Sequence, residues 1–358
     1  MLFVTNGHGE VAIAERIAAE LRLLGDWRTD HFPLVGAAFE RPDFPDVGPQ
    51  ARMPSGGLVA MGNVRAFAED LRAGFAALWF RQRAFLRRCA GRYGLVIAVG
   101  DVYALILARL AHTPLVYVGT AKSAYVAPYG PFERRLLRAA RAIFVRDART
   151  AEALRAAGVP AESPGNVIVD LAASTQTFVW NAPLRLALLP GSRERAYADG
   201  ERLAAVARAV IGLCPGVQAA LSIAPGLDPA RFARFLGPAY PELVEGWPGD
   251  VGALIREATL AIGQAGTANE AAAAAGIPVV ALDLADARKS DWYRMRQGRL
   301  LGEALAIVPG TVAGAAAAIA DLLGDEARRA RMGAVGRERM GPPGGARAIA
   351  QRIAALAA

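Results

Sequence analysis

At 358 residues, the chain is too long for one ordinary core and fits two domains of about 170 residues each. A hydrophobic fraction of 54% excludes a disordered chain, and the two cysteines exclude a disulfide scaffold. The net charge of +8 is concentrated, because residues 52–149 carry 16 Lys and Arg against 5 Asp and Glu. Such a basic block indicates an anionic partner, namely a phospholipid surface, a nucleic acid or a phosphorylated substrate.

Targeting signals are not evident in the sequence. Neither a basic leader with a cleavage site nor a window of about 18 apolar residues is present. The expected location is therefore the cytoplasm, with the protein either soluble or peripheral at the inner face of the cell membrane.

The first half of the chain alternates strands and helices. Residues 2–5 are predicted to form a buried strand, followed by a turn at 6–10 and a helix with apolar residues at 13, 17, 21 and 24. Further strands are predicted at residues 95–99, 114–118 and 142–145, with helices at 103–111 and 150–157. This βαβ order predicts a parallel sheet that is buried on both faces.

The alternation of predicted strands and helices stops at residues 174–183 and then resumes. The second half is predicted to contain strands at 184–189, 217–223, 258–262 and 278–282, with helices at 198–212 and from 269 onward. The predicted fold class is α/β, with two doubly wound domains joined near residue 180. In such domains ligands bind at the carboxyl ends of the strands.

Two glycine loops in the second half suit a phosphorylated ligand. After the strand at 184–189, Gly191, Ser192 and Arg193 lead into a helix, where free amides and a cation favour phosphate. After the strand at 258–262, Gln264, Gly266 and Thr267 precede a helix that carries Glu270. Glu270 can accept both hydroxyls of a ribose, or it is simply a favourable first-turn acid. Because both loops follow strands of one sheet, they predict a site for a nucleoside diphosphate.

These runs resemble a known family. LALLPGSRERA and GQAGTANEAAAAAGIPVVAL are similar to the donor domain of lipid-A-disaccharide synthase. VTNGHGEVAIAERIA and SPGNVIVDL are similar to the proteins related to that synthase. The resemblance covers nearly the whole chain, with residues 30–92 divergent. It implies a GT-B fold, a UDP-sugar donor, a role for Gln297 at the donor sugar or phosphate, and a last helix that returns to the first domain. The expected domains are residues 1–178, 179–340 and 341–358.

The sequence departs from the synthase pattern at two positions. Ala271 stands where the synthase has its glutamate, so that Glu270 is displaced by one residue, and Val11 stands where the synthase has an aspartate. Both departures concern the lipid A reaction, while nucleotide-sugar binding is expected to be retained.

Three residues near the first and second predicted strands are candidates for chemistry. His8 lies between two glycines, where an imidazole can take a proton from an acceptor hydroxyl, and Glu10 can do the same or orient His8. The alternative is that these polar residues cap the helix. Asp101 ends a strand and resembles the aspartate proposed as catalytic in the synthase; alternatively it is a plain helix N-cap.

Residues 67–92 combine aromatic side chains with arginines. Helical spacing places Phe75 and Trp79 on an apolar face and Arg83 and Arg87 opposite them. This pattern predicts an interfacial helix that contacts an anionic membrane and a lipid acceptor. The alternative is a helix packed on the core with a solvated basic face.

The sequence therefore predicts a glycosyltransferase that moves an N-acetylhexosamine or hexose from a UDP-sugar to a lipid-linked or glycolipid acceptor. Neither a cofactor nor a metal is expected, because the loops contain no Asp-x-Asp pair and helix dipoles with Arg can take the charge of the leaving diphosphate. Two alternatives are a UDP-sugar epimerase of the same fold and a degenerate, nucleotide-sugar-binding membrane scaffold. No nucleic acid partner is expected, since no binding motif accompanies the basic block.

Overall fold

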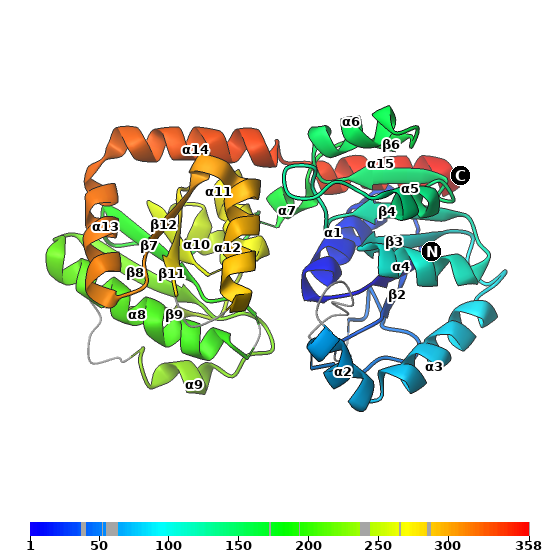
Figure 1. Cartoon of the computed structure of the whole chain (residues 1–358), viewed down its shortest axis with the longest axis horizontal. Coiled ribbons are helices and arrows are strands. Elements are labelled where there is room, and N and C mark those ends of the chain that lie inside the picture. Colours follow the sequence, from blue (N-terminus) through cyan, green and yellow to red (C-terminus); the bar gives the residue numbers. More distant parts are fainter. Residues whose placement is uncertain are drawn as a thin grey trace. The chain divides into compact units, whose positions relative to one another are not determined.

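The chain folds into two compact units (Figure 1). Residues 1–167 and 343–358 form the first unit, and residues 168–342 form the second. The computed structural model describes residues 1–36, 41–51, 53–54, 64–171, 173–192, 194–236, 244–264, 266–284 and 288–357.

Parallel strands form the centre of the first unit, in the order β2-β1-β3-β4-β5-β6. These strands are β1 (Leu2–Thr5), β2 (Asp30–Pro33), β3 (Val96–Gly100), β4 (Leu115–Gly119), β5 (Ala142–Val145) and β6 (Ala161–Glu162). Every residue of β1, β3 and β4 is buried, as in a sheet covered by helices on both faces. The parallel sheet predicted from the βαβ pattern is confirmed.

Helices cover both faces of this sheet. They are α1 (His8–Leu24), α2 (Val64–Arg72), α3 (Phe75–Arg88), α4 (Val102–Ala108), α5 (Pro131–Leu137), α6 (Ala148–Ala156), α7 (Val167–Asp170) at the unit boundary, and α15 (Gly345–Ala357). The C-terminal helix α15 packs along α1, with Ile349 and Ile353 buried (Figure 1). It begins beside Gly165, where a Cβ on Gly345 would lie 2.6 Å from the Gly165 carbonyl carbon. A glycine at position 345 therefore lets the last helix approach the first unit closely.

The second unit repeats the architecture, with strand order β12-β11-β10-β7-β8-β9. Its strands are β7 (Leu184–Leu189), β8 (Val217–Ser222), β9 (Glu245–Trp247), β10 (Leu260–Gly263), β11 (Val279–Asp283) and β12 (Leu305–Pro309). Its helices are α8 (Ala196–Leu213), α9 (Pro229–Ala233), α10 (Val251–Ile255), α11 (Thr267–Ala274), α12 (Arg288–Leu301), α13 (Val312–Gly324) and α14 (Glu326–Met340). Helices α8 and α13 pack together, as do α11 and α14.

The boundary between the units was expected between residues 178 and 179, but it lies between Val167 and Ile168. The segment that follows is tied to the second unit by hydrogen bonds and ring contacts. Ser174 Oγ bonds the Asp250 carboxylate at 2.9 Å, and the ring of Phe178 lies 5.4 Å from that of Trp247. The irregular residues that read as a linker are therefore packed against the second unit.

Candidate functional site

The two glycine loops of the second unit leave adjacent strands. The strand order places the topological switch point between β7 and β10, since the chain runs from β7 through β8 to β9 and then returns to the other side of β7. Leu189 pairs with Gly263 in the parallel register, so the loops that follow both strands begin side by side. This adjacency was expected from the sequence and is confirmed.

Open space surrounds the glycines of both loops. Gly191 and Gly266 each have a φ of +101°, a conformation that glycine adopts readily and other residues rarely. A Cβ built at either glycine would meet no described atom within 4 Å. Ser192 is exposed beside the first glycine. The backbone at both positions is therefore accessible to a ligand.

Glu270 lies where the sequence predicted, in the first turn of α11, which begins at Thr267. Its neighbour Asn269 is fully buried and donates from Nδ2 to the Gly263 carbonyl and to Gln297 Oε1, both at 3.2 Å. Gln297 Nε2 in turn donates to the Gly266 carbonyl at 3.5 Å. The amide of Gln297 thus bonds both the first turn of α11 and the Gly266 carbonyl of the loop, so Gln297 fixes the loop against the helix.

Two buried polar atoms at this loop find no hydrogen-bond partner among the described residues. They are Nε2 of Gln264 and Oδ1 of Asn269. A buried polar group without a partner costs about 1–3 kcal/mol. Asn269 was not among the residues singled out from the sequence; its position directly before Glu270 in the first turn of a helix was the available signal.

The expected cation of the first loop, Arg193, lies outside the described residues. The nearby Arg195 is described, and its Nε lies 3.2 Å from the Asp199 carboxylate on the next turn of α8. Arg195 is therefore paired within its own helix.

The first unit has its own switch point, between β1 and β3. Here Asn6 Nδ2 donates to Asp101 Oδ2 at 2.8 Å. The other carboxylate oxygen of Asp101 accepts from the backbone N–H groups of Tyr103 at 3.0 Å and Ala104 at 3.1 Å. Asp101 is therefore the N-cap of α4, one of the two readings left open by the sequence, and it also fastens the loop after β1.

Burial raises the pKa of Asp101 above its ordinary value, because a low-dielectric surrounding disfavours the charged form. The hydrogen bonds from Ala104, Asn6 and Tyr103 oppose this shift, since they favour the carboxylate.

Glu10 reaches the same switch point. A Cβ on Gly100 would lie 2.5 Å from Glu10 Cγ, and a Cβ on Gly7 would lie 2.6 Å from Glu10 Oε2. Two glycines thus make room for the Glu10 side chain between the ends of β1 and β3. His8 is the first residue of α1, directly after Gly7, and its side chain lies outside the described part of the structure. The fold therefore brings Asn6, Glu10 and Asp101 together with the backbone of His8.

No protein-family model and no curated protein matches the sequence, but solved structures do. MnaA of S. aureus, solved with UDP, gives a TM-score of 0.64 at 13% identity over 99% of this chain and 96% of that one. A putative UDP-N-acetylglucosamine 2-epimerase from Listeria monocytogenes gives 0.62 at 17% identity over 99% and 95%. The calicheamicin glycosyltransferase gives 0.60 at 18% identity over 99% and 97%. The chain has the GT-B fold.

The GT-B fold predicted by resemblance is thereby confirmed at the level of architecture. Identities below 20% establish the fold and not the activity. Both transferases and epimerases occur among the GT-B structures that match.

One interfacial helix was expected over residues 67–92, but the structure has two helices there, α2 and α3. They are separated at Gly74, which has a φ of +94°. Phe75 is 9% exposed and belongs to the core, and Trp79 is half-buried against that core. The guanidinium of Arg83 lies over the Trp79 ring at 4.2 Å, while Arg87 is exposed. The aromatic side chains expected at a membrane are therefore partly core residues in this GT-B protein.

Other apolar side chains remain exposed on these helices. Phe67 and Leu71 on α2 are 39% and 48% exposed, and Phe80 on α3 is 64% exposed. The exposed arginines of α3 are Arg81, Arg87 and Arg88. The combination of exposed apolar and cationic side chains thus persists, but of the four residues expected to form it only Arg87 is fully exposed.

Proposed function

We propose that the protein is a metal-independent glycosyltransferase that moves an N-acetylhexosamine or hexose from a UDP-sugar to a lipid-linked or glycolipid acceptor. One observation carries this proposal. At the switch point of the second unit, two open glycine loops leave adjacent strands, and the buried carboxylate of Glu270 lies in the first turn of the following helix. Free amides at a helix N-terminus suit a diphosphate, and a carboxylate at such a position suits ribose hydroxyls.

In this proposal, the donor diphosphate contacts the backbone of Gly191–Ser192 and Gly266–Thr267, and Arg193 adds positive charge. Glu270 accepts hydrogen bonds from the ribose. Asn269 and Gln297 hold the second loop in its conformation. The amides and the N-terminus of α11 stabilise the charge that develops on the leaving diphosphate, so the reaction calls for neither metal nor cofactor.

The chemical step is an inverting displacement. The acceptor hydroxyl oxygen forms a bond to the anomeric carbon, its proton passes to the His8 imidazole, and the bond from the anomeric carbon to the diphosphate breaks as UDP leaves. Glu10 orients or assists His8 from the same turn. Asp101, whose oxygens accept three hydrogen bonds, anchors the loop through Asn6 rather than acting as the base.

UDP is expected to raise the thermal stability of the protein. A ligand at 100 times its dissociation constant adds ~2.7 kcal/mol to the free energy of unfolding, which corresponds to roughly 5–10 °C in the melting temperature of a domain of this size. Differential scanning fluorimetry with UDP, GDP and ADP measures the shift and its base preference. If no nucleoside diphosphate shifts the melting temperature, the donor site is assigned wrongly.

The loop arginines offer a matched pair for this assay. Arg193→Ala is expected to weaken UDP binding by about 1.5–3 kcal/mol, the range for a hydrogen bond to a charged group. Arg195→Ala is the control, because Arg195 is already paired with Asp199. Equal affinities for the two variants would remove Arg193 from the site.

The second candidate function is a UDP-sugar epimerase, because an epimerase is among the solved structures with this fold. Incubating the protein with UDP-N-acetylglucosamine and no acceptor separates the two, since an epimerase changes the sugar at once and a transferase needs an acceptor. Nucleotide binding without turnover under either condition supports the scaffold alternative.

We place the protein at the cytoplasmic face of the membrane in this proposal. The exposed Phe67, Leu71 and Phe80 beside arginines of α3 support this location. No helix in the described ranges is long and apolar enough to cross a membrane. Each cation close to an anionic surface contributes about 1 kcal/mol, so a few arginines suffice to hold a peripheral protein.

Binding to vesicles is expected to require anionic lipid and to weaken with salt, because the Debye length falls from ~10 Å at 0.1 M to ~3 Å at 1 M. Replacing Arg81, Arg87 and Arg88 by Gln should release the protein, and Phe80→Ser should weaken the binding that survives salt. The control is Arg328→Gln with Arg331→Gln, two exposed positions on α14. Co-sedimentation that is equal for neutral and anionic vesicles contradicts the membrane proposal.

A further inference from the structure

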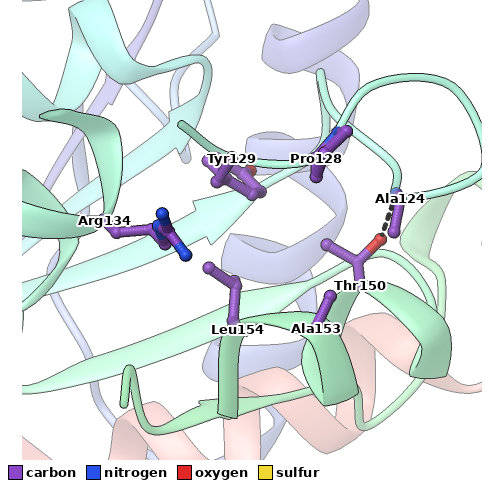
Figure 2. A pocket seen from close by; sticks show the side chains of 7 residues that line it. All are labelled: Ala124, Pro128, Tyr129, Arg134, Thr150, Ala153 and Leu154. Carbon is purple, nitrogen blue, oxygen red and sulfur yellow. Dashed lines mark hydrogen bonds between the residues drawn. The ribbon is translucent and has the colours of Figure 1, made fainter. Parts of the chain in front are cut away.

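A small cavity lies in the first unit between the loop that follows β4 and the helix α6. Its volume is about 60 Å³. Seven residues line it, namely Ala124, Pro128, Tyr129, Arg134, Thr150, Ala153 and Leu154 (Figure 2). Figure 2 shows the guanidinium of Arg134, on α5, directed into the space between Tyr129 and Leu154. None of these residues belongs to the proposed nucleotide site of the second unit.

Arg134 is a cation with no counter-charge in the described part of the chain. Within the described residues, its side chain makes no hydrogen bond or ion pair. The neighbouring Glu133 is buried and already binds Lys122 Nζ at 2.6 Å and the Gly130 N–H at 2.7 Å. On the next turn, Arg138 donates to the carbonyl of Ala157 at 2.9 Å. The positive charge of Arg134 therefore faces the cavity (Figure 2) and is not neutralised by the described residues.

The other residues that line the cavity are uncharged. Tyr129 is buried, and its hydroxyl lies 3.3 Å from that of Tyr117, so its hydrogen bond is made away from α6. Thr150 is also satisfied, since its hydroxyl donates to Asp147 Oδ1 at 2.6 Å and accepts from the Ala124 N–H at 2.8 Å. Asp147 caps α6 by accepting from the Thr150 N–H.

The size of the cavity limits its ligand. A water molecule occupies about 30 Å³ of liquid, so 60 Å³ holds a pair of waters or one compact anionic group, and it is too small for a nucleotide or a sugar ring. Guanidinium groups bind phosphate with directed, charge-assisted hydrogen bonds.

We propose that this cavity is a binding site for a single phosphoryl group, held by Arg134. The phosphoryl group belongs either to a phosphorylated lipid or to free phosphate. The site lies in the same unit as His8 and Asp101, and it is independent of the nucleotide loops of the second unit.

Three variants test the site. Arg134→Gln removes the charge, Ala153→Leu fills the cavity while keeping the charge, and Arg135→Gln removes an exposed charge on the same helix that does not line the cavity. Arg134 is partly exposed, so its replacement leaves the core intact, and far-ultraviolet circular dichroism verifies folding of all three. Thermal shift is titrated with inorganic phosphate and with dihexanoyl phosphatidic acid below its micelle concentration, at constant ionic strength.

Both Arg134→Gln and Ala153→Leu are expected to weaken the response by about 10-fold or more, while Arg135→Gln matches the wild type. Saturating UDP is present in a parallel series, so that phosphate binding at the nucleotide loops does not contribute. A response confined to inorganic phosphate assigns free phosphate, and a stronger response to the lipid assigns a phosphorylated lipid. If the wild type responds to neither probe, or if Arg134→Gln responds as the wild type does, the proposal is overturned. Failure of UDP to bind leaves the comparison of these variants intact.

Discussion

Replacing His8 by alanine should lower the turnover of sugar transfer by about 10²–10⁴-fold while leaving the affinity for UDP nearly unchanged. The expected loss is that of a general base, because the acceptor hydroxyl must give up its proton as the new bond forms. His8 follows Gly7 at the switch point of the first unit, next to the loop that Asn6 ties to Asp101. Turnover is measured with UDP-sugar and a glycolipid acceptor, and UDP affinity by thermal shift.

Asp101→Asn is the matched variant. Asparagine is as good an N-cap as aspartate, so α4 keeps its start while the carboxylate is lost. If His8 is the base, this variant retains most of the turnover. Loss of activity in Asp101→Asn, together with activity in His8→Ala, would make Asp101 the base.

The pH dependence of stability gives Asp101→Asn a second readout. Burial raises the folded-state pKa of Asp101 above that of the unfolded chain. The stability linked to Asp101 is therefore present at pH values below its unfolded pKa and is lost as the pH rises through its folded pKa. Asp101→Asn should remove this component, which urea unfolding at several acidic pH values detects.

Replacing Glu270 by alanine should weaken UDP binding about 10- to 100-fold, the effect of losing hydrogen bonds to a charged group. Glu270 is 8% exposed in the first turn of α11, beside the open backbone of Gly266. Because the proposed role of the carboxylate is to accept from ribose hydroxyls, the wild type should prefer UDP over 2′-deoxy-UDP, and the variant should lose that preference. Calorimetric titration of both nucleotides measures the two affinities.

Glu257→Ala is the control for this measurement, since Glu257 is an exposed carboxylate of the same unit that pairs with Arg185 at 2.8 Å. It should leave both affinities unchanged. A Glu270→Ala variant that keeps the full preference for UDP would show that Glu270 is a first-turn acid of the helix and not a ligand of the ribose.

Local sequence patterns were sufficient to predict the bounds of several central strands. The strands Leu2–Thr5, Ala142–Val145 and Leu184–Leu189 have the bounds that the sequence predicted, because strands covered on both faces are mainly apolar. The edge strands β2 and β9 were not predicted, since their residues are mixed in polarity. Strand β9 contains only Glu245–Trp247, too short for periodicity to register.

Residues 67–92 show where periodicity failed. The helical spacing of apolar residues was real, but it continued across Gly74, where the backbone turns into the left-handed region and ends one helix before the next begins. Spacing did place Phe75 on the apolar face and the exposed Phe80 off it, but it could not show whether that face meets the core or a membrane. That choice depends on what packs against each helix.

The sequence by itself determined the α/β class, the parallel sheets and the two glycine loops at one sheet edge, since each follows from a short run of residues and from the rule that parallel strands end together. Only the tertiary structure decided which side chains meet. Asn6 and Asp101 are 95 positions apart, and Asn269 meets Gln297 across 28 positions. Arg134 on α5 lines a cavity together with residues of the loop after β4 and of α6. Such contacts arise from the packing of segments that are distant in sequence, so local propensity does not predict them.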